Sequence, residues 1–439
     1  MHAYPAQLAA AVAARWARLE RLSDPGPCEL RAGDLPDHTA LEHLISVAYQ
    51  ASLLQEEARP VRFRVLVGDP GRLPLDAGPP EGLQPLVFAR PRAYDEQELR
   101  RLAPAAKYHR ALIGVRQSGA GAFEIWGIVQ SGPRWLLSVR GGRALPSPLP
   151  SDALVVRVAG PGLVAVGLGD VTLGELRVGQ LQGVPLDAFD AEWLATRFAP
   201  FRAQLAAEHE AAFGPGAIPL DPNLMRQVSQ HMFKRVIAIL RETHHGATLL
   251  FVPDARVARL LGDEGPLRLK YAFADGAPRR RHRALLRAVM REVALAAAEA
   301  PSPPERAGWA LFESSRRESV AALDESILEV SHLIAALGDV DGAVVMTDRF
   351  ELLGFGAEIA GRLPEISAVR RALDLEASAS DLVPIDSVGT RHRSAYRLCS
   401  LERDAIAVVV SQDGAVQFVT WYEGGPTYWE HVPLVGAEP

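Results

Sequence analysis

LDESILEVSHLIAALGDVDGAVVM, residues 323–346, is the stretch that decides the fold of this chain. Apolar residues recur at helical spacing from Leu323 to Leu337, and Gly338 then stops the helix. The apolar run Ala343–Met346 follows and is typical of a buried strand. A helix that leads directly into a buried strand is characteristic of α/β proteins, so we expect an α/β fold.

A second helix–strand pair lies upstream, where an amphipathic helix over 225–239 precedes the apolar strand Ala247–Val252. The chain closes with Ile406–Val410 and Val416–Val419, which flank a two-residue hairpin signal. We therefore expect a mixed-sheet α/β domain over residues 217–439. Between the two pairs the pattern is irregular, and we interpret residues 254–318 as an insertion that contains one helix, 284–300.

The first half has a different pattern. Residues 61–67 alternate apolar and basic side chains, which predicts a strand with one face in water. Five further short apolar runs are separated by glycine- and proline-rich turns, at 111–115, 123–129, 135–139, 154–158 and 163–166. We expect a β-rich α+β domain over residues 1–186, followed by a helical connector over 187–216 that ends at Gly214-Pro215-Gly216.

Composition narrows the choice of partners. A length of 439 residues suggests two or three domains, and a net charge of -6 does not favour nucleic acid or an acidic membrane surface. No apolar run approaches the ~20 residues that a transmembrane helix needs. The only cysteines, Cys28 and Cys399, match no zinc or redox spacing. We expect a cytoplasmic protein with no membrane or nucleic-acid partner.

The segment Gly389-Thr390-Arg391-His392-Arg393 is the best candidate phosphate site. Arginine offers two parallel donors to phosphate oxygens, threonine adds a neutral donor, and glycine lets the backbone come close. The alternative is a solvated basic turn. Arg281-His282-Arg283 repeats three of the residue types, but it lacks the Gly-Thr lead and runs into a helix instead of lying between strands. We interpret that copy as a solvated helix start.

Asp341-Gly342-Ala343 lies where the helix ending at Gly338 gives way to a strand. A carboxylate there can bind Mg²⁺ or Mn²⁺, which prefer oxygen ligands, and the glycine leaves room for a ligand against the backbone. The alternative is a turn in which the aspartate only caps.

Together the two motifs resemble the diadenylate cyclase family, in which Asp-Gly-Ala is followed downstream by Gly-Thr-Arg-His-Arg. The resemblance covers roughly residues 220–430. It departs from the family at Asp339-Val340, where members usually carry Leu-His, and at Ser411-Gln412-Asp413, where members carry Ser-Glu-Glu.

The resemblance implies that two ATP molecules are condensed into cyclic di-AMP with release of pyrophosphate. It implies that Asp341 and Asp413 hold Mn²⁺ or Mg²⁺, that Asp341, Gly342 and Ala343 lie at the reacting centre, and that the nucleotide is held by Gly389, Thr390, Arg391, His392, Arg393 and Ser411. Each domain would bind one ATP, so activity requires two cyclase domains that associate face to face.

Two alternatives stay open for the second half: a nucleotide-binding regulator without turnover, and an enzyme of the same fold that makes another cyclic dinucleotide. The first half resembles, more weakly, the sensor-type domains that precede such cyclases. Its ligand is unknown, and its Phe123, Trp126 and Trp135 are expected in the core.

Overall fold

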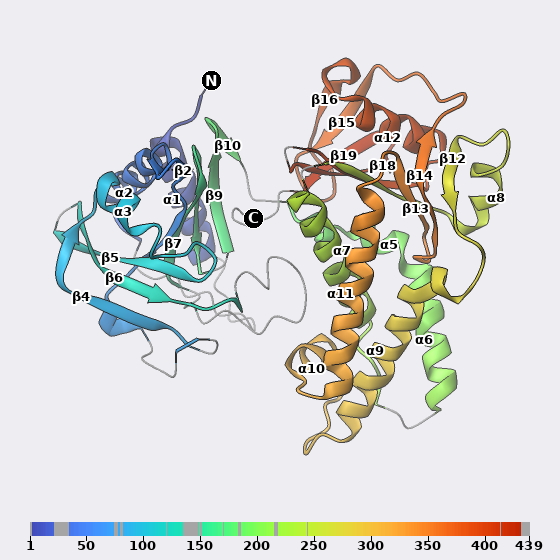
Figure 1. Ribbon diagram of the computed structural model, residues 1–439, viewed down its shortest axis with the longest axis horizontal. Coiled ribbons are helices and arrows are strands. Elements are labelled where there is room, and N and C mark those ends of the chain that lie inside the picture. The colour runs from blue at the N-terminus through green and yellow to red at the C-terminus, as the bar shows by residue number, and fades with distance from the viewer. Residues whose placement is uncertain are drawn as a thin grey trace. The chain divides into compact units, whose positions relative to one another are not determined.

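The computed structural model describes residues 2–21, 35–73, 78–79, 82–119, 121–134, 149, 152–169, 171–182, 186–214, 218–243, 245–412 and 414–431. The described residues up to 182 form one compact unit, and those from 186 onward form a second (Figure 1). Both units combine helices with a β-sheet, so the expected α/β class is confirmed. Residues 135–139, which the sequence predicts as a strand, lie outside the described residues.

The N-terminal unit is built on one sheet of eight strands in the order β10-β9-β8-β7-β3-β5-β6-β4. Only β3 and β5 pair in parallel, and the other neighbours are antiparallel. The helices α1 and α2 cover one face of this sheet. Its elements are α1 (Pro5–Arg21), α2 (His38–Ser52), β1 (Gln55–Glu56), β2 (Arg59–Pro60), β3 (Phe63–Val67), η1 (Pro70–Arg72), β4 (Gln84–Ala93), α3 (Glu96–Leu102), β5 (Ala111–Gly119), β6 (Ala122–Gln130), β7 (Leu154–Gly160), β8 (Leu163–Leu168), β9 (Val171–Arg177) and β10 (Gln180–Gln182).

The strand predicted over 61–67 exists as β3, but the prediction of a wet face is wrong. Arg64 is fully buried, because β3 lies in the middle of the sheet and both of its faces are covered. Its Nη2 donates to Ser131 Oγ at 3.1 Å, and its neighbour across the β7 pairing is Arg157, which is also buried. The alternating pattern therefore placed arginines in the interior of the sheet, where Arg64 keeps a hydrogen bond to Ser131. Phe123 and Trp126 are buried, as expected.

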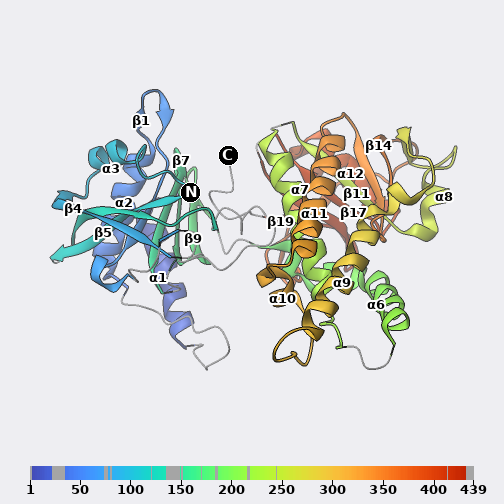
Figure 2. The ribbon, with the colours of Figure 1, turned by 60° about the horizontal axis from the view of Figure 1, so that its bottom comes forward.

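The C-terminal unit is a sheet of nine strands with helices on both faces. The strand order is β12-β14-β13-β11-β17-β18-β19-β15-β16. The helices α7, α9 and α11 cover one face, and α12 covers the other (Figures 1 and 2). Its strands are β11 (Ala247–Val252), β12 (Leu267–Ala272), β13 (Ala343–Thr347), β14 (Leu352–Ile359), β15 (Ala368–Ala372), β16 (Ser380–Pro384), β17 (Ile406–Val410), β18 (Val416–Tyr422) and β19 (Gly425–His431).

The helices of this unit are distributed along its sequence from Ala188 to Leu401. They are η2 (Ala188–Asp190), α5 (Glu192–Arg197), α6 (Ala199–Phe213), α7 (Leu224–Glu242), η3 (Asp254–Arg256), α8 (Val257–Leu260), η4 (Ala277–Arg280), α9 (Arg281–Ala298), α10 (Trp309–Ser314), α11 (Glu318–Gly338), η5 (Ile385–Ser387) and α12 (Thr390–Leu401). The predicted helix–strand pairs are α7 with β11 and α11 with β13. Segment 254–318, which the sequence pattern suggests as an insertion, supplies an edge strand, β12, and a helix, α9, whose apolar face is part of the core.

The connector segment also belongs to the core of this unit. Trp193 of α5 stacks on Trp429 of β19, with ring centroids 4.3 Å apart. Phe189 of η2 meets Phe418 of β18 edge to face at 5.2 Å. These aromatic contacts fix the start of the unit on its sheet. Among the helices of the described residues, none combines the length and hydropathy needed to cross a bilayer.

Gly342 holds a backbone conformation that the sheet requires. Its φ is +110°, and a Cβ at this position would lie 2.6 Å from the carbonyl carbon of Gly356 on β14. On the side where a side chain would project, the space at Gly342 is therefore filled by the neighbouring strand β14. Gly389, the other motif glycine, has an ordinary φ of -66° with nothing near its missing side chain.

Replacing each motif glycine by serine separates these two roles. We expect Gly342→Ser to lower the free energy of unfolding by about 2 kcal/mol or more, because it combines backbone strain with a steric clash. Gly389→Ser should change it by less than about 0.5 kcal/mol, since serine is a favoured N-cap residue. Urea unfolding followed by tryptophan fluorescence measures both, and equal losses would contradict this account of Gly342.

Candidate functional site

The sheet brings the sequence motifs to one edge. β11 runs parallel to β13, with Thr248 opposite Ala343, and antiparallel to β17, with Ala247 opposite Val410. The residues just before β13 and those just after β17 therefore lie at the same edge. Asp341 precedes β13, and Ser411 follows β17.

An open pocket of about 880 Å³ lies at this edge. It contains most of the residues that the sequence singled out, from both motifs. It is lined by Thr248, Lys270, Asp341, Gly342, Ala343, Ala357, Glu358, Ile359, Ala360, Gly389, Thr390, Arg391, His392, Ser394, Ser411 and Gln412. Arg393 is not in the lining, and Asp413 lies outside the described residues.

The sequence suggested that the Gly-Thr-Arg-His-Arg segment lies between strands. In the structure it forms the start of a helix instead. Gly389 is the N-cap of α12, and the helix begins at Thr390. Gly389 has no side chain to accept a hydrogen bond, and the first turn of α12 contains no acidic residue. The first backbone N–H groups of a helix are unsatisfied within it and carry partial positive charge, so this end of α12 favours an anion.

Arg391 supplies the principal positive charge of the pocket. Its guanidinium lies against Gly246, where a Cβ would come within 2.5 Å of Nη1. With Gly246 at a φ of +73°, the loop before β11 leaves room that a larger residue would remove. Arg391 makes no ion pair with any carboxylate of the described residues. Arg393 instead turns back along the helix, and its Nη2 donates to Thr390 Oγ1 at 3.2 Å.

His392 connects the helix to the strand edge. Its Nε2 lies 3.3 Å from Ser411 Oγ, and both side chains are partly buried in the pocket wall. Which of the two groups donates depends on the tautomer of the imidazole. The hydrogen bond fixes the ring at the end of β17, so that the histidine and the serine hydroxyl face the same space as Arg391.

The second Arg-His-Arg segment has a different environment. It also begins a helix, α9, but His282 is buried and burial lowers its pKa to about 3. The expectation that this segment is fully solvated is therefore wrong for the histidine. Arg283 pairs with Glu208, and Arg281 is exposed outside the pocket. Two similar tripeptides thus differ because only the one at 391–393 reaches an open pocket.

Asp341 is the pocket carboxylate that could hold a metal ion. It is exposed, and no group of three metal-binding side chains occurs within the residues that the structure describes. The donors present fit Mn²⁺ or Mg²⁺ only as an ion shared with a substrate, since these cations complete their coordination with water and phosphate oxygens. Asp341 would then supply the protein ligand.

Several residues of the lining were missed by sequence reasoning, among them Thr248, Lys270 and Glu358. Thr248 on β11 is buried, and its hydroxyl has no hydrogen-bond partner within the described part of the chain. A single threonine in the apolar run Ala247–Val252 is the signal that could have found it. Lys270 of β12 and Glu358 of β14 lie 3.7 Å apart at the pocket's other side. Lys270 was overlooked because it falls in the presumed insertion.

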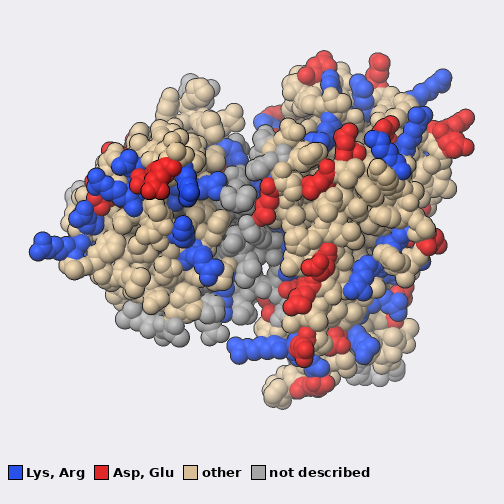
Figure 3. Space-filling view, viewed as in Figure 1, with Lys and Arg blue, Asp and Glu red and all other residues tan. Residues whose placement is uncertain are grey.

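The pocket as a whole can bind a compact polyanion. It combines a helix N-terminus, the cations Arg391 and Lys270, and hydroxyl donors. Of its two carboxylates, Asp341 could hold a metal ion and Glu358 pairs with Lys270. On the face of the C-terminal unit in Figure 3, acidic and basic side chains alternate without a broad patch of one sign. Recognition of phosphate in the pocket would rest on the few side chains that line it.

Comparison with known proteins gives one match. A family model described as "Probable sensor domain DACNV" matches residues 31–130, which run from α2 to β6 of the N-terminal unit. This agrees with the expected sensor-type domain in the first half of the chain. No curated protein and no solved structure matches the chain.

Binding of pyrophosphate tests the anion site directly. We expect Arg391→Gln to weaken it by about 10- to 100-fold, because hydrogen bonds to a charged group contribute about 1.5–3 kcal/mol. Arg281→Gln, an exposed arginine at the start of α9, is the matched control and should bind as the wild type does. Isothermal titration calorimetry gives both affinities. Similar losses in the two variants would show that only general charge matters.

Proposed function

We propose that residues 217–439 are a diadenylate cyclase domain, which converts two ATP molecules into cyclic di-AMP and two pyrophosphates. The observation that carries the proposal is the shared pocket. Asp341, before β13, and Arg391 and His392, in the first turn of α12, are far apart in sequence yet line one space. The match at residues 31–130 adds support, because this sensor class is typical of the N-termini of diadenylate cyclases.

The residues of the pocket have distinct parts in the proposed reaction. The N-terminus of α12, Arg391 and Thr390 hold phosphate oxygens and neutralise charge, which is the main contribution of proteins to phosphoryl chemistry. Asp341 would hold the metal ion and would favour loss of the proton from the 3′-hydroxyl that attacks. The metal ion, when bound, supplies positive charge to the phosphates and the attacking oxygen.

One pocket holds one nucleotide, so each domain supplies half of the reaction. In the proposal two domains face each other, and each ribose 3′-oxygen attacks the α-phosphate of the opposite ATP, with pyrophosphate as leaving group. Two such attacks close the ring. Positioning of the two nucleotides in line accounts for most of the rate, because it replaces a bimolecular encounter by a fixed geometry. The N-terminal unit is proposed to control this association in response to its own ligand.

Separate substitutions of two nearby aspartates test the assignment of Asp341. With Mn²⁺ and ATP, Asp341→Asn should lower synthesis of cyclic di-AMP by about 100-fold or more, since loss of a group that moves a proton has that scale. Asp339→Asn removes an exposed carboxylate two residues upstream that does not line the pocket, and it should retain activity. Product is identified by mass spectrometry, and circular dichroism checks folding. Equal activity in the two variants would show that Asp341 does not take part in the reaction.

The same assay separates the alternatives. Gln412 stands at the pocket where the diadenylate cyclase family has an acidic residue, which favours a nucleotide-binding regulator as the second candidate. Wild-type protein that binds ATP but forms no product, with Mn²⁺ or Mg²⁺, would support the regulator. A product with another base from mixtures of ATP and GTP would indicate a different cyclic dinucleotide.

A further inference from the structure

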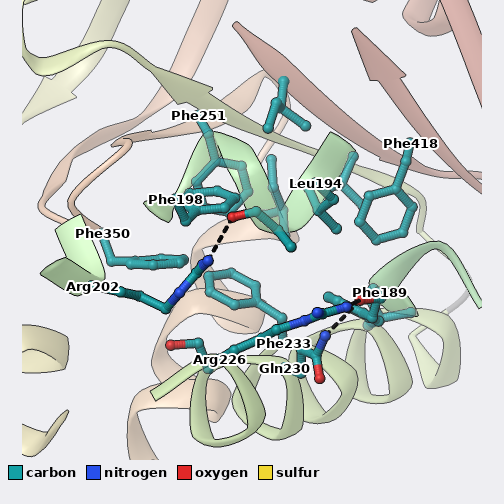
Figure 4. A pocket seen from close by; sticks show the side chains of 16 residues that line it. Phe189, Leu194, Phe198, Arg202, Arg226, Gln230, Phe233, Phe251, Phe350 and Phe418 are labelled. Carbon is teal, nitrogen blue, oxygen red and sulfur yellow. Dashed lines mark hydrogen bonds between the residues drawn. The ribbon is translucent and has the colours of Figure 1, made fainter. Parts of the chain in front are cut away.

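A second cavity lies on the opposite face of the C-terminal sheet, between α5, α6 and α7 and the strands β11 and β17. Its volume is about 60 Å³, which exceeds the space of one water molecule. Six phenylalanines line it, namely Phe189, Phe198, Phe233, Phe251, Phe350 and Phe418 (Figure 4). An apolar wall offers water few partners, so this space favours an apolar group of about the size of a ring.

Among the residues that the structure describes, Arg202 and Arg226 are the only charged ones that line this cavity. Arg202 comes from α6, and its Nη2 donates to the carbonyl of Ala195 at 2.8 Å. Arg226 comes from the first turn of α7, and its Nη2 donates to the carbonyl of Phe189 at 3.1 Å. Figure 4 shows both bonds. Each guanidinium has five N–H donors, so a bond to one carbonyl leaves several for a ligand.

The charge of these arginines is not neutralised by direct pairing. Neither makes an ion pair with a carboxylate of the described residues. Burial lowers the pKa of Arg202, the positive charge of Arg226 lowers it further, and Glu192 acts in the opposite direction. Asp190 interacts with Arg226 at longer range, and burial raises the pKa of that carboxyl. Two like charges beside an apolar cavity therefore favour an anion between them.

The other polar residues of the lining add no charge. Ser229 of α7 lines it, and its Oγ lies 3.3 Å from Nε2 of His282. His282 is neutral at physiological pH because burial lowers its pKa to about 3. Gln230 donates to the same Phe189 carbonyl as Arg226. The site thus combines aromatic walls with two arginines, Arg202 and Arg226.

We propose that this cavity binds a small aromatic carboxylate, with its ring among the phenylalanines and its carboxylate on Arg202 and Arg226. Arginine presents paired donors that match a carboxylate, and the N-terminal end of α7 adds a favourable potential for an anion. Phenylalanine faces and edges suit an aromatic ring better than a flexible chain. The inference does not depend on the proposed cyclase activity.

This site is separate from the pocket that contains Asp341 and Arg391, which we call the phosphate pocket. The two sites use opposite faces of the same strands. On β11, Leu249 and Phe251 line the aromatic cavity, whereas Thr248 lines the phosphate pocket. On β17, Ile406 and Val408 line the cavity, and Ser411, just beyond the strand, lines the pocket. Successive side chains of a strand point to opposite faces, so a ligand in one site does not touch the other.

Three probe molecules separate the contribution of the aromatic ring to binding from that of the carboxylate. Phenylacetate has the ring and the carboxylate, 2-phenylethanol has the ring alone, and acetate has the carboxylate alone. In calorimetric titrations of the full chain, we expect phenylacetate to bind with a Kd of about 1 mM or below, as a ligand of its size can. 2-Phenylethanol and acetate should each bind at least about 10-fold more weakly. The first lacks the carboxylate and its hydrogen bonds, and the second lacks the apolar ring.

Variants locate the binding. Arg202→Gln and Arg226→Gln should each weaken phenylacetate binding by about 10-fold or more, and Ala195→Leu should abolish it by filling the cavity. Arg391→Gln in the phosphate pocket and the exposed Arg281→Gln should bind as the wild type does. No binding of phenylacetate to the wild type, equal binding of 2-phenylethanol, or loss of binding only in Arg391→Gln would each overturn the proposal.

Discussion

The pairing of β11 with a parallel neighbour on one side and an antiparallel neighbour on the other is the constraint on which the C-terminal unit depends. Parallel pairing puts the start of β13 beside the start of β11, and antiparallel pairing puts the end of β17 there too. Asp341 and Ser411 share an edge for this reason alone. The apolar face of α12 packs on β17 and β18, and its N-terminus consequently reaches the same edge. The directions of β11, β13 and β17 therefore determine where the pocket lies.

Sequence patterns predicted the parts of this arrangement that depend on local periodicity. The amphipathic helices α7 and α11 and the buried strands that follow them were recognised, because apolar spacing of 3.6 residues and unbroken apolar runs are distinct signals. The start of α12 was not recognised. Its first turn is polar, and the side chains that bury it, Ala395, Tyr396, Leu398 and Cys399, come only later in the helix. The sequence singled out Gly389 to Arg393 by residue type, but it did not indicate their place at a helix N-terminus.

Features that depend on distant segments could not be predicted. Whether Arg64 faces water depends on what covers the other face of its sheet, and the strand itself carries no such information. The membership of Lys270 in the pocket depends on β12 pairing with β14, which the irregular pattern around it conceals. The aromatic cavity is assembled from segments spread between Phe189 and Phe418, so each phenylalanine is indistinguishable in sequence from an ordinary core residue. The predicted metal ligand Asp413 lies outside the described residues.

The placement of two chemically different sites on the two faces of β11 and β17 has a consequence for how this protein can change. A strand alternates its side chains strictly, so insertion or deletion of one residue within either strand would reverse every side chain beyond that point. Thr248 would then face the aromatic cavity, and Leu249 would face the phosphate pocket. Both sites would be lost in one step. These two strands can therefore vary by substitution but not in length, whereas the hairpin loop that joins β18 and β19 is free of that restriction.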